Sequence, residues 1–166
     1  MSSMNTDLKG LLYKLSEERI RRCFVVAVNK TVRKYSRVFV RVLGRKSRIP
    51  QKLLSERVWV QKAVTKNPEA VFSFISDFFP AASMGVKKQD RRGVRAGRIH
   101  YRSAFIARVR GKEGVWRRVG KSPYPIKRVG EDLTPEAKAA LAGLIPKIEQ
   151  DYMKTLEGEL RKYLDK

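Results

Sequence analysis

Apolar residues recur at steps of three and four along the first quarter of the chain, from Asp7 to about Leu43. This spacing is that of one face of an α-helix, so it predicts a long amphipathic helix over residues 7–45. No proline interrupts the run, and Gly44 provides a stop signal. About 36 residues at 1.5 Å each span roughly 54 Å, more than the ~40 Å diameter of a compact domain of this size. The helix is therefore expected to bend or to lie against a neighbouring subunit.

The hydrophobic period changes to two after residue 57, which is typical of β-strands. Turn sequences at 65–69 (TKNPE) and 111–114 (GKEG) separate runs that are rich in β-branched and aromatic residues. These two turns predict two hairpins, and a short helix is expected before them at 47–57. The expected strands are 57–64, 70–79, 103–110, 115–119 and 125–129.

A second helical pattern ends the chain. Thr134 and Pro135 have the residue types of an N-cap and a first helical position, which predicts a helix over residues 135–164. Pro146 removes a backbone donor and predicts a kink or split. The fold class is thus α+β: a long N-terminal helix, a mainly antiparallel sheet of four or five strands, and a C-terminal helix packed on the sheet. A length of 166 residues predicts a single domain.

Charge adds a functional constraint. The chain has 38 Lys and Arg against 16 Asp and Glu, a formal charge of +22, which favours a polyanion or an acidic protein as partner. Residues 85–102 combine three glycines with seven basic residues and one Asp, which predicts a mobile basic loop. Phosphate attraction without sequence readout and a merely solvated loop both fit this segment. Its candidate binding residues are Lys87, Lys88, Arg91, Arg92, Arg95 and Arg98.

Four arginines stand at strict steps of four on the first predicted helix and just past its end: Arg33, Arg37, Arg41 and Arg45. Like charges at this spacing cost about 0.2–0.5 kcal/mol per pair in an isolated helix. Two interpretations remain open. The row is a solvated face, or it meets acidic subunits or nucleic acid.

Catalytic and metal chemistry find little support in the sequence. Cys23 lies among apolar residues and is expected to be buried, and His100 has no evident catalytic partner. Glu131 and Asp132 precede the last helix, where they suit the helix dipole better than acid–base work. We expect no enzyme activity, no metal, no cofactor and no disulfide. No signal peptide and no membrane span are expected either, which predicts synthesis in a reducing cytoplasm.

The stretch VGKSPYPI, residues 119–126, sets a stiff corner between a predicted hairpin and the last strand. Together with LLSERVWVQKAVTKNPEA at 53–70, this order of elements resembles the prophage minor tail protein Z family, the tail completion proteins of long-tailed phages. The resemblance covers roughly residues 24–145. Prolines fix their own φ and restrict the preceding residue, so Pro123, Tyr124 and Pro125 keep one direction. They form either an edge that docks a partner or an internal turn with the tyrosine in the core.

The resemblance implies a virion structural protein at the head-proximal end of the tail, acting in tail assembly and head–tail joining. It implies other tail and neck proteins as partners and a homo-oligomeric ring, with a hexamer favoured. Genomic DNA is a further, non-specific partner under this interpretation, and a membrane is not. The protein would reside in the virion tail and, during assembly, in the host cytoplasm.

Two other classes stay open at this point. A bacterial nucleic-acid-binding protein of ribosomal or nucleoid type explains the charge, and salt-sensitive binding to bare DNA would favour it. A membrane-active amphipathic helix is the third option, which liposome binding by residues 7–45 would support.

Overall fold

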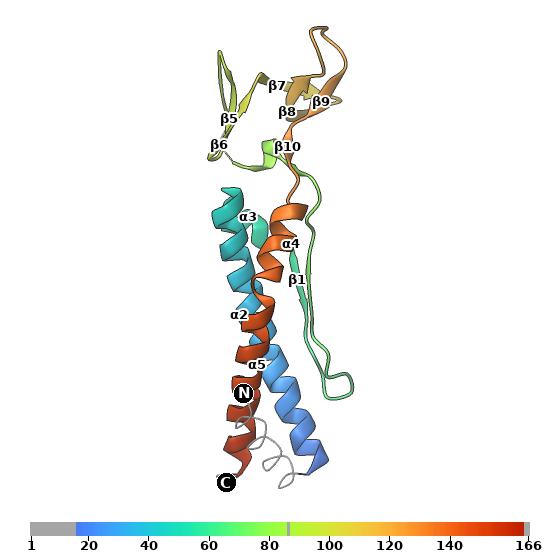
Figure 1. Ribbon diagram of the computed structural model, residues 1–166. Coiled ribbons are helices and arrows are strands. Elements are labelled where there is room, and N and C mark those ends of the chain that lie inside the picture. The colour runs from blue at the N-terminus through green and yellow to red at the C-terminus, as the bar shows by residue number, and fades with distance from the viewer. Residues whose placement is uncertain (1–15, 86, 165–166) are drawn as a thin grey trace. The chain divides into compact units, whose positions relative to one another are not determined.

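The computed structural model describes residues 16–85 and 87–164, and its elements are labelled in Figure 1. The helices are α2 (Glu17–Ser47), α3 (Gln51–Ser55), the 3-10 turn η1 (Ala81–Ser83), α4 (Thr134–Ala142) and α5 (Ile145–Leu164). The strands are β1 (Val58–Gln61), β2 (Val71–Phe74), β3 (Phe79–Pro80), β4 (Lys87–Asp90), β5 (Gly93–Ala96), β6 (Ile99–Arg102), β7 (Ala104–Val109), β8 (Lys112–Arg118), β9 (Ile126–Arg128) and β10 (Gly130–Glu131). This composition confirms the α+β class.

The long N-terminal helix is confirmed from Glu17 onward. Ser16 is not helical, and its carbonyl oxygen accepts the N–H of Ile20 at 3.1 Å, so the helix starts at Glu17. The first turn carries Glu17 and Glu18 and the last turn Arg45 and Lys46, as the helix dipole favours. The expected portion 7–15 lies outside the described residues. The 31 residues of α2 span about 46 Å.

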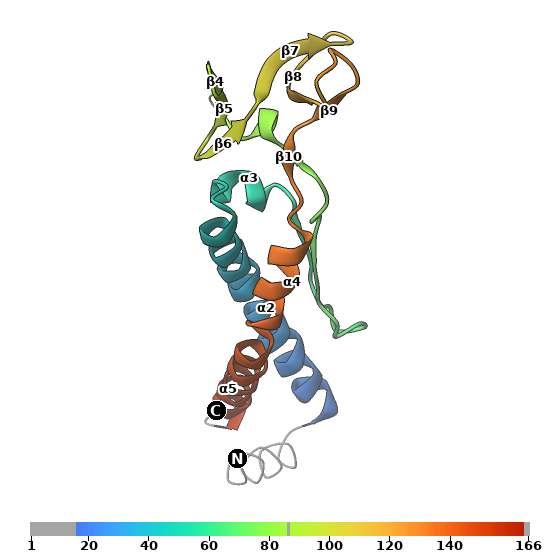
Figure 2. The same cartoon turned by 45° about the horizontal axis from the view of Figure 1, so that its top comes forward.

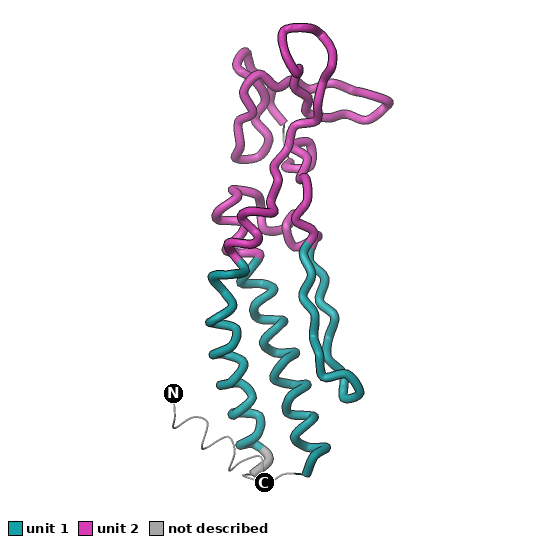
Figure 3. The backbone as a smooth tube through the Cα atoms, turned by 45° about the vertical axis from the view of Figure 1, so that its right-hand side comes forward, with its two compact units in different colours: residues 1–39, 58–74, 141–166 teal, residues 40–57, 75–140 magenta. Residues whose placement is uncertain are grey.

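The residues divide into two compact units, coloured separately in Figure 3. The first comprises residues 1–39, 58–74 and 141–166, and the second comprises residues 40–57 and 75–140. The single-domain interpretation stays a prediction.

In the first unit, α2 is the common packing partner of α5 and of the β1–β2 hairpin. Cys23 and Ala27 of α2 form a buried cluster with Leu156 and Leu160 of α5. On the hairpin side, the Phe39 ring meets Phe72 and Phe74 edge-on, with ring centroids 5.0 and 5.2 Å apart. The C-terminal helix thus packs along α2. The sequence analysis had instead expected it to pack on the sheet. The reason is that its leucine stripe matches small side chains on α2.

The predicted helix 135–164 is split, as Pro146 indicated. α4 ends at Ala142 and α5 begins at Ile145, so the proline occupies the second position of a new helix, where no intrahelical donor is lost. At the start of α4, the Asp132 carboxylate accepts the N–H of Thr134 at 2.9 Å. This contact confirms the capping role expected for Asp132. Glu131 instead pairs with Phe79 as part of β10.

The antiparallel strands are confirmed, but among the described residues they form four small sheets of two or three strands instead of one sheet. The predicted hairpins are β1–β2 and β7–β8, and the predicted last strand adds to the second hairpin as β9. β10 pairs with β3, a contact between short segments that have no strand pattern of their own.

Residues 85–102 correct the expectation of a mobile loop, because they contain the three-stranded sheet β4–β5–β6, called the basic sheet below (Figure 2). The register places Gln89, Val94 and Tyr101 side by side on one face. Val94 and Ala96 are fully buried and Tyr101 nearly so. The basic composition therefore concealed an alternation in which every second residue of β5 and β6 packs inward.

No helix within residues 16–85 and 87–164 is long and apolar enough to cross a lipid bilayer.

Candidate polyanion-binding surface

The four arginines of the first helix, called the basic stripe below, are all exposed on α2: Arg33, Arg37, Arg41 and Arg45. None of them forms an ion pair with any residue that the structure describes. Their repulsion at steps of four is consequently not neutralised inside the described protein. The stripe has the electrostatic properties of a surface that binds negative charge.

The neighbouring lysines of α2 behave differently because they face α5. Lys30 pairs with Glu159 at 2.7 Å, and Lys34 pairs with Asp151. Hydrogen bonding to Lys34 and then to Tyr35 holds the pKa of Asp151 below its ordinary value, and Lys30 and Lys162 do the same for Glu159. These lysines are thus paired with carboxylates of α5, unlike the arginines of the basic stripe.

The Tyr35 hydroxyl completes this contact between the two helices. It lies 2.7 Å from Oδ2 of Asp151 and 2.9 Å from the carbonyl oxygen of Lys147. Burial, followed by the neighbouring carboxylate, raises the pKa of Tyr35 to about 12. The phenol is therefore a fixed neutral donor in the packing of α2 on α5.

The outer face of the basic sheet aligns three basic side chains across its strands. Lys88 stands opposite Arg95, and Arg95 stands opposite His100. Lys88 and Arg95 are exposed, and like charges directly across a sheet destabilise it. Arg91 and Arg92 lie in the β4–β5 turn and Arg98 in the β5–β6 turn, all of them exposed. Five of the six residues expected for this segment thus lie at the surface.

Lys87 is the exception among the six. Its side chain is 22% exposed, and its ammonium group pairs with Glu113 of β8. This pairing also keeps the pKa of Glu113 below its ordinary value. Lys87 joins two sheets of the second unit and is not part of the exposed basic surface.

Asp90 organises the turn between β4 and β5. Its Oδ1 accepts the N–H groups of Arg92 at 2.7 Å and Gly93 at 2.9 Å, and its Oδ2 lies 3.3 Å from Nε2 of His100. The first of these main-chain bonds is the main cause that lowers the pKa of Asp90. This carboxylate is therefore committed to the turn, and His100 has a structural partner.

A pocket of about 510 Å³ opens beside this turn within the second unit. Its lining includes four arginines, called the arginine pocket below: Arg91 and Arg92 of the turn with Arg117 and Arg118 of β8. Sequence reasoning missed Arg117 and Arg118, because they lie in a predicted strand far from the basic segment. The one available signal was the pair of adjacent arginines at a strand end.

The Pro123–Tyr124–Pro125 corner lies at the surface. The Tyr124 side chain is 76% exposed, so the interpretation of a tyrosine packed in the core is wrong. The N–H of Val119 donates to the carbonyl oxygen of Pro125 at 2.9 Å and closes the loop, and the Tyr124–Pro125 peptide is cis. The corner presents an aromatic ring to the outside, as a docking edge requires.

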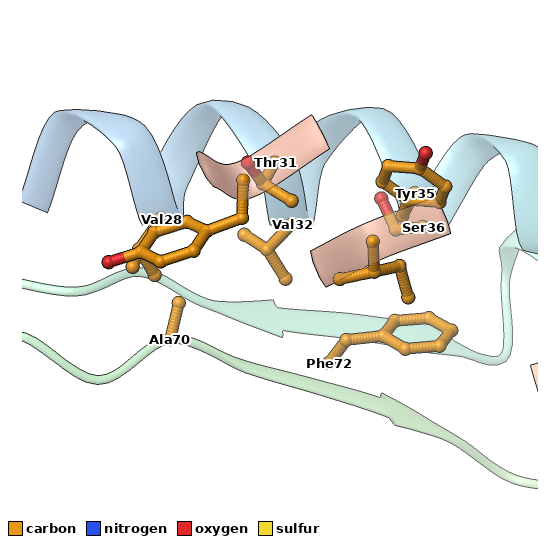
Figure 4. Close-up of a pocket in the computed structure, with 9 residues that line it drawn as sticks. Val28, Thr31, Val32, Tyr35, Ser36, Ala70 and Phe72 are labelled. Carbon is orange, nitrogen blue, oxygen red and sulfur yellow. The ribbon is translucent and has the colours of Figure 1, made fainter. Parts of the chain in front are cut away.

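An apolar cavity of about 320 Å³ lies in the first unit between α2, β2 and α5. Figure 4 shows Val28 and Val32 of the helix on one side, with Ala70 and Phe72 on the strand side. Thr31 Oγ1 is buried without a hydrogen-bond partner among the described residues. The described lining contains no carboxylate, imidazole or thiol, and its polar groups are the hydroxyls of Thr31, Ser36, Tyr35 and Tyr152.

The reactive groups of the described chain are dispersed. No group of three or more His, Cys, Asp or Glu side chains capable of holding a metal occurs in residues 16–85 and 87–164. The Cys23 thiol is buried, as expected, and its burial raises its pKa, which disfavours the nucleophilic thiolate.

Comparison with known proteins relates the chain to phage tail proteins. A family model described as prophage minor tail protein Z matches residues 8–166. A tail completion protein of Escherichia phage N15 is 28% identical over 165 residues, which cover 89% of this chain and 90% of that protein. No solved structure matches the chain.

Proposed function

Since the chain belongs to the prophage minor tail protein Z family, and is thus a phage tail protein, we propose that it completes the tail at its head-proximal end. The observation that supports this proposal is the family match over nearly the whole length, together with the similarity to a tail completion protein. The role is structural and non-catalytic. The protein acts in tail assembly and in joining the tail to the head, first in the host cytoplasm and then in the virion.

The basic stripe supplies the proposed contact with other virion proteins. Arg33 and Arg37 are exposed and unpaired within the described protein. Contact with an acidic surface of a tail or neck protein would neutralise their charges and lower the electrostatic energy. Tyr124 offers an aromatic anchor of the kind found at protein interfaces. The family assignment favours this role over a ribosomal or nucleoid one.

We further propose that the working form is a closed ring, with a hexamer favoured. A tail end presents several equivalent sites around one axis, and a cyclic assembly repeats one heterologous interface around it. Native mass spectrometry of the purified protein, alone and with isolated tails, measures the stoichiometry. A purely monomeric protein that also binds tails as a single copy contradicts the ring.

The position on the tail is tested by electron microscopy of particles that carry a C-terminal affinity tag on this chain, labelled with gold-conjugated antibody. The label is expected at the tail end that meets the head, and on free tails at one end only. Label along the tube or at the distal tip contradicts the proposed position. Untagged particles provide the control for non-specific label.

A further inference from the structure

The arginine pocket has features of a built anion site. Arg91, Arg92, Arg117 and Arg118 line one cavity of about 510 Å³, and the lining also includes one carboxylate, Asp90, which is bound to the main chain of its turn. A guanidinium group presents its N–H donors in a planar fork that matches the oxygens of a phosphate or carboxylate group. Four arginines and one carboxylate leave the lining of this cavity with a net positive charge, which an anion would neutralise.

The turn that carries two of these arginines is held rigidly. The Asp90 carboxylate binds two main-chain N–H groups of the turn, and the N–H of Ser103 donates to the carbonyl oxygen of Arg92 at 2.9 Å. Gly93 permits this close approach, since a Cβ there would lie 2.0 Å from the carbonyl oxygen of Tyr101. The turn backbone is therefore preorganised before any ligand binds.

The two arginines of β8 are also constrained. The Arg118 guanidinium lies over the Phe105 ring, 5.8 Å from its centroid. Nε of Arg117 is buried and has no hydrogen-bond partner among the described residues. A buried donor without a partner costs free energy, which an oxygen ligand that reaches this donor would recover. Besides the positive charge, this unpaired donor is a second indication that the pocket binds a ligand with oxygen acceptors.

The charge around the pocket identifies the class of ligand. Residues 86–130 contain fifteen Lys and Arg and two carboxylates, Asp90 and Glu113, both already paired within the protein. Interfaces with DNA are much more positively charged than interfaces between proteins. A DNA strand also brings one negative charge per nucleotide, about 3.4 Å along the helix axis, and so neutralises a surface of uniform sign.

We propose that the arginine pocket binds a backbone phosphate group of DNA, with the exposed cations of the basic sheet contacting the neighbouring phosphates. The outer face of the sheet carries Lys88, Arg95, His100 and Arg102. Its one aromatic ring among the described residues is the His100 imidazole, which Asp90 already holds, so the face lacks the row of aromatic side chains on which successive bases stack. Binding is therefore independent of base sequence. The inference goes beyond the proposed tail role and does not require it, because purified protein suffices to test it.

The test uses the full chain and a fluorescein-labelled DNA duplex, with binding followed by fluorescence anisotropy over a range of salt concentrations. The variant R92Q/R118Q removes one guanidinium from each side of the pocket. It is expected to weaken binding about tenfold, equally for unrelated duplex sequences, and to reduce the magnitude of the salt slope by about one. The control R110Q/K112Q removes the same charge at two exposed positions outside the pocket, Arg110 in the β7–β8 turn and Lys112 at the start of β8, and is expected to have a much smaller effect.

Equal losses in the pocket and control variants would show that net charge alone acts, and would overturn the proposal. R92K/R118K keeps the charge without the fork and is the second variant should the glutamine pair unfold. It is expected to bind several-fold more weakly than the parent, since lysine lacks the bidentate geometry. Unchanged affinity of the lysine pair overturns the site.

Two further ligands distinguish the sources of the anion. If R92Q/R118Q weakens binding of poly-glutamate as strongly as that of DNA, the pocket accepts a protein carboxylate and the proposal is wrong. If inorganic phosphate binds the parent but not this variant, while DNA affinity is the same for both, the pocket holds free phosphate and the proposal is also wrong. The tail-labelling experiment is independent of all these outcomes, so the two proposals fail separately.

Discussion

The side-chain amide of Asn29 binds both main-chain groups of Ala63: Oδ1 accepts its N–H and Nδ2 donates to its carbonyl oxygen, each at 2.9 Å. Ala63 is buried, so these bonds satisfy groups that water does not reach. They also anchor the end of the β1–β2 hairpin to α2.

We expect Asn29→Ala to lower the free energy of unfolding by about 1–3 kcal/mol, the cost of leaving buried polar groups without partners. Urea unfolding followed by circular dichroism measures the effect. Asn29→Asp retains the acceptor but lacks the donor and is expected to retain part of the stability. A loss below about 0.5 kcal/mol for Asn29→Ala, the range of ordinary surface substitutions, contradicts the anchoring role.

The ion pairs between α2 and α5 predict a pH dependence of stability. The pKa values of Asp151 and Glu159 are lowered from their ordinary values of 3.8 and 4.5. A depressed pKa means that the stabilisation is fully present above the ordinary value and is lost as the pH falls through the folded-state value. The thermal midpoint is expected to decrease below about pH 4.5 in low salt.

The double variant D151N/E159Q removes these two titrations. Its midpoint at neutral pH should be lower than that of the parent, and its decline towards acid pH should be shallower. Because Lys30 and Lys34 are more than half exposed, salt should reduce the difference. Parallel pH profiles for parent and variant would mean that other carboxylates cause the acid sensitivity.

Adding a single methyl group at Gly93 is expected to destabilise the protein strongly. The φ of this glycine is +153°, and a Cβ would lie 2.0 Å from the Tyr101 carbonyl oxygen inside the basic sheet. Gly93→Ala is expected to lower the free energy of unfolding by about 3 kcal/mol or more, because strain and a main-chain clash combine.

Gly111→Ala is the matched control for this substitution. Gly111 also has a positive φ, +76°, but a Cβ there meets no atom within 4 Å. Its cost should be only the backbone term of about 1–2 kcal/mol. Equal effects of the two substitutions in urea unfolding would show that the close approach at Gly93 is unimportant.

The basic stripe predicts a defect in assembly without a defect in folding. R37E/R41E reverses two exposed charges while keeping helix-forming residues, so helix content and solubility should persist. The yield of infectious particles in a complementation assay should decrease sharply. K52E/K66E makes the same change in charge at exposed positions outside the stripe and should support normal yields. Normal yields from R37E/R41E would identify the stripe as a solvated face.

Tyr124 predicts a separate contribution to assembly. Because the ring is 76% exposed, Tyr124→Ala should change the free energy of unfolding by less than about 0.5 kcal/mol. If the corner docks a partner, the same variant should complete fewer tails, and Tyr124→Phe should restore most of the function through its ring. A large loss of stability, or full function of Tyr124→Ala, contradicts the docking role.

The sequence was sufficient where the stabilising pattern is local. The turn sequences at 65–69 and 111–114 predicted the β1–β2 and β7–β8 hairpins, and Pro146 predicted the division between α4 and α5. The second turn is shorter than expected, because Lys112, Glu113 and Gly114 pair with β7 as part of β8. Each signal acts within a few residues, through φ restriction or alternation, and does not depend on the rest of the chain. The family resemblance likewise rested on short sequence motifs at residues 53–70 and 119–126, and the family is confirmed.

The basic sheet was missed although its pattern is in the sequence. β5 and β6 each have only two inward-facing apolar positions. So short an alternation is hard to recognise in a segment whose composition is dominated by Lys, Arg and Gly. What orders the segment is tertiary. Lys87 pairs with Glu113, and the N–H of Ile106 donates to Gln89 at 2.8 Å, contacts that join β4 to two other strands.

Only the tertiary structure shows which Lys and Arg side chains are paired with carboxylates inside the protein and which remain free to bind a partner. Lys34 and Arg33 are adjacent in the sequence and equally basic, yet Lys34 meets Asp151, 117 residues away, and Arg33 meets no carboxylate in the described chain. In the same way, Arg92 and Arg118 come from different sheets and share one pocket. A sequence fixes the sign and number of charges, whereas the energy of each charge depends on its distance from the others in space, which only the folded chain defines.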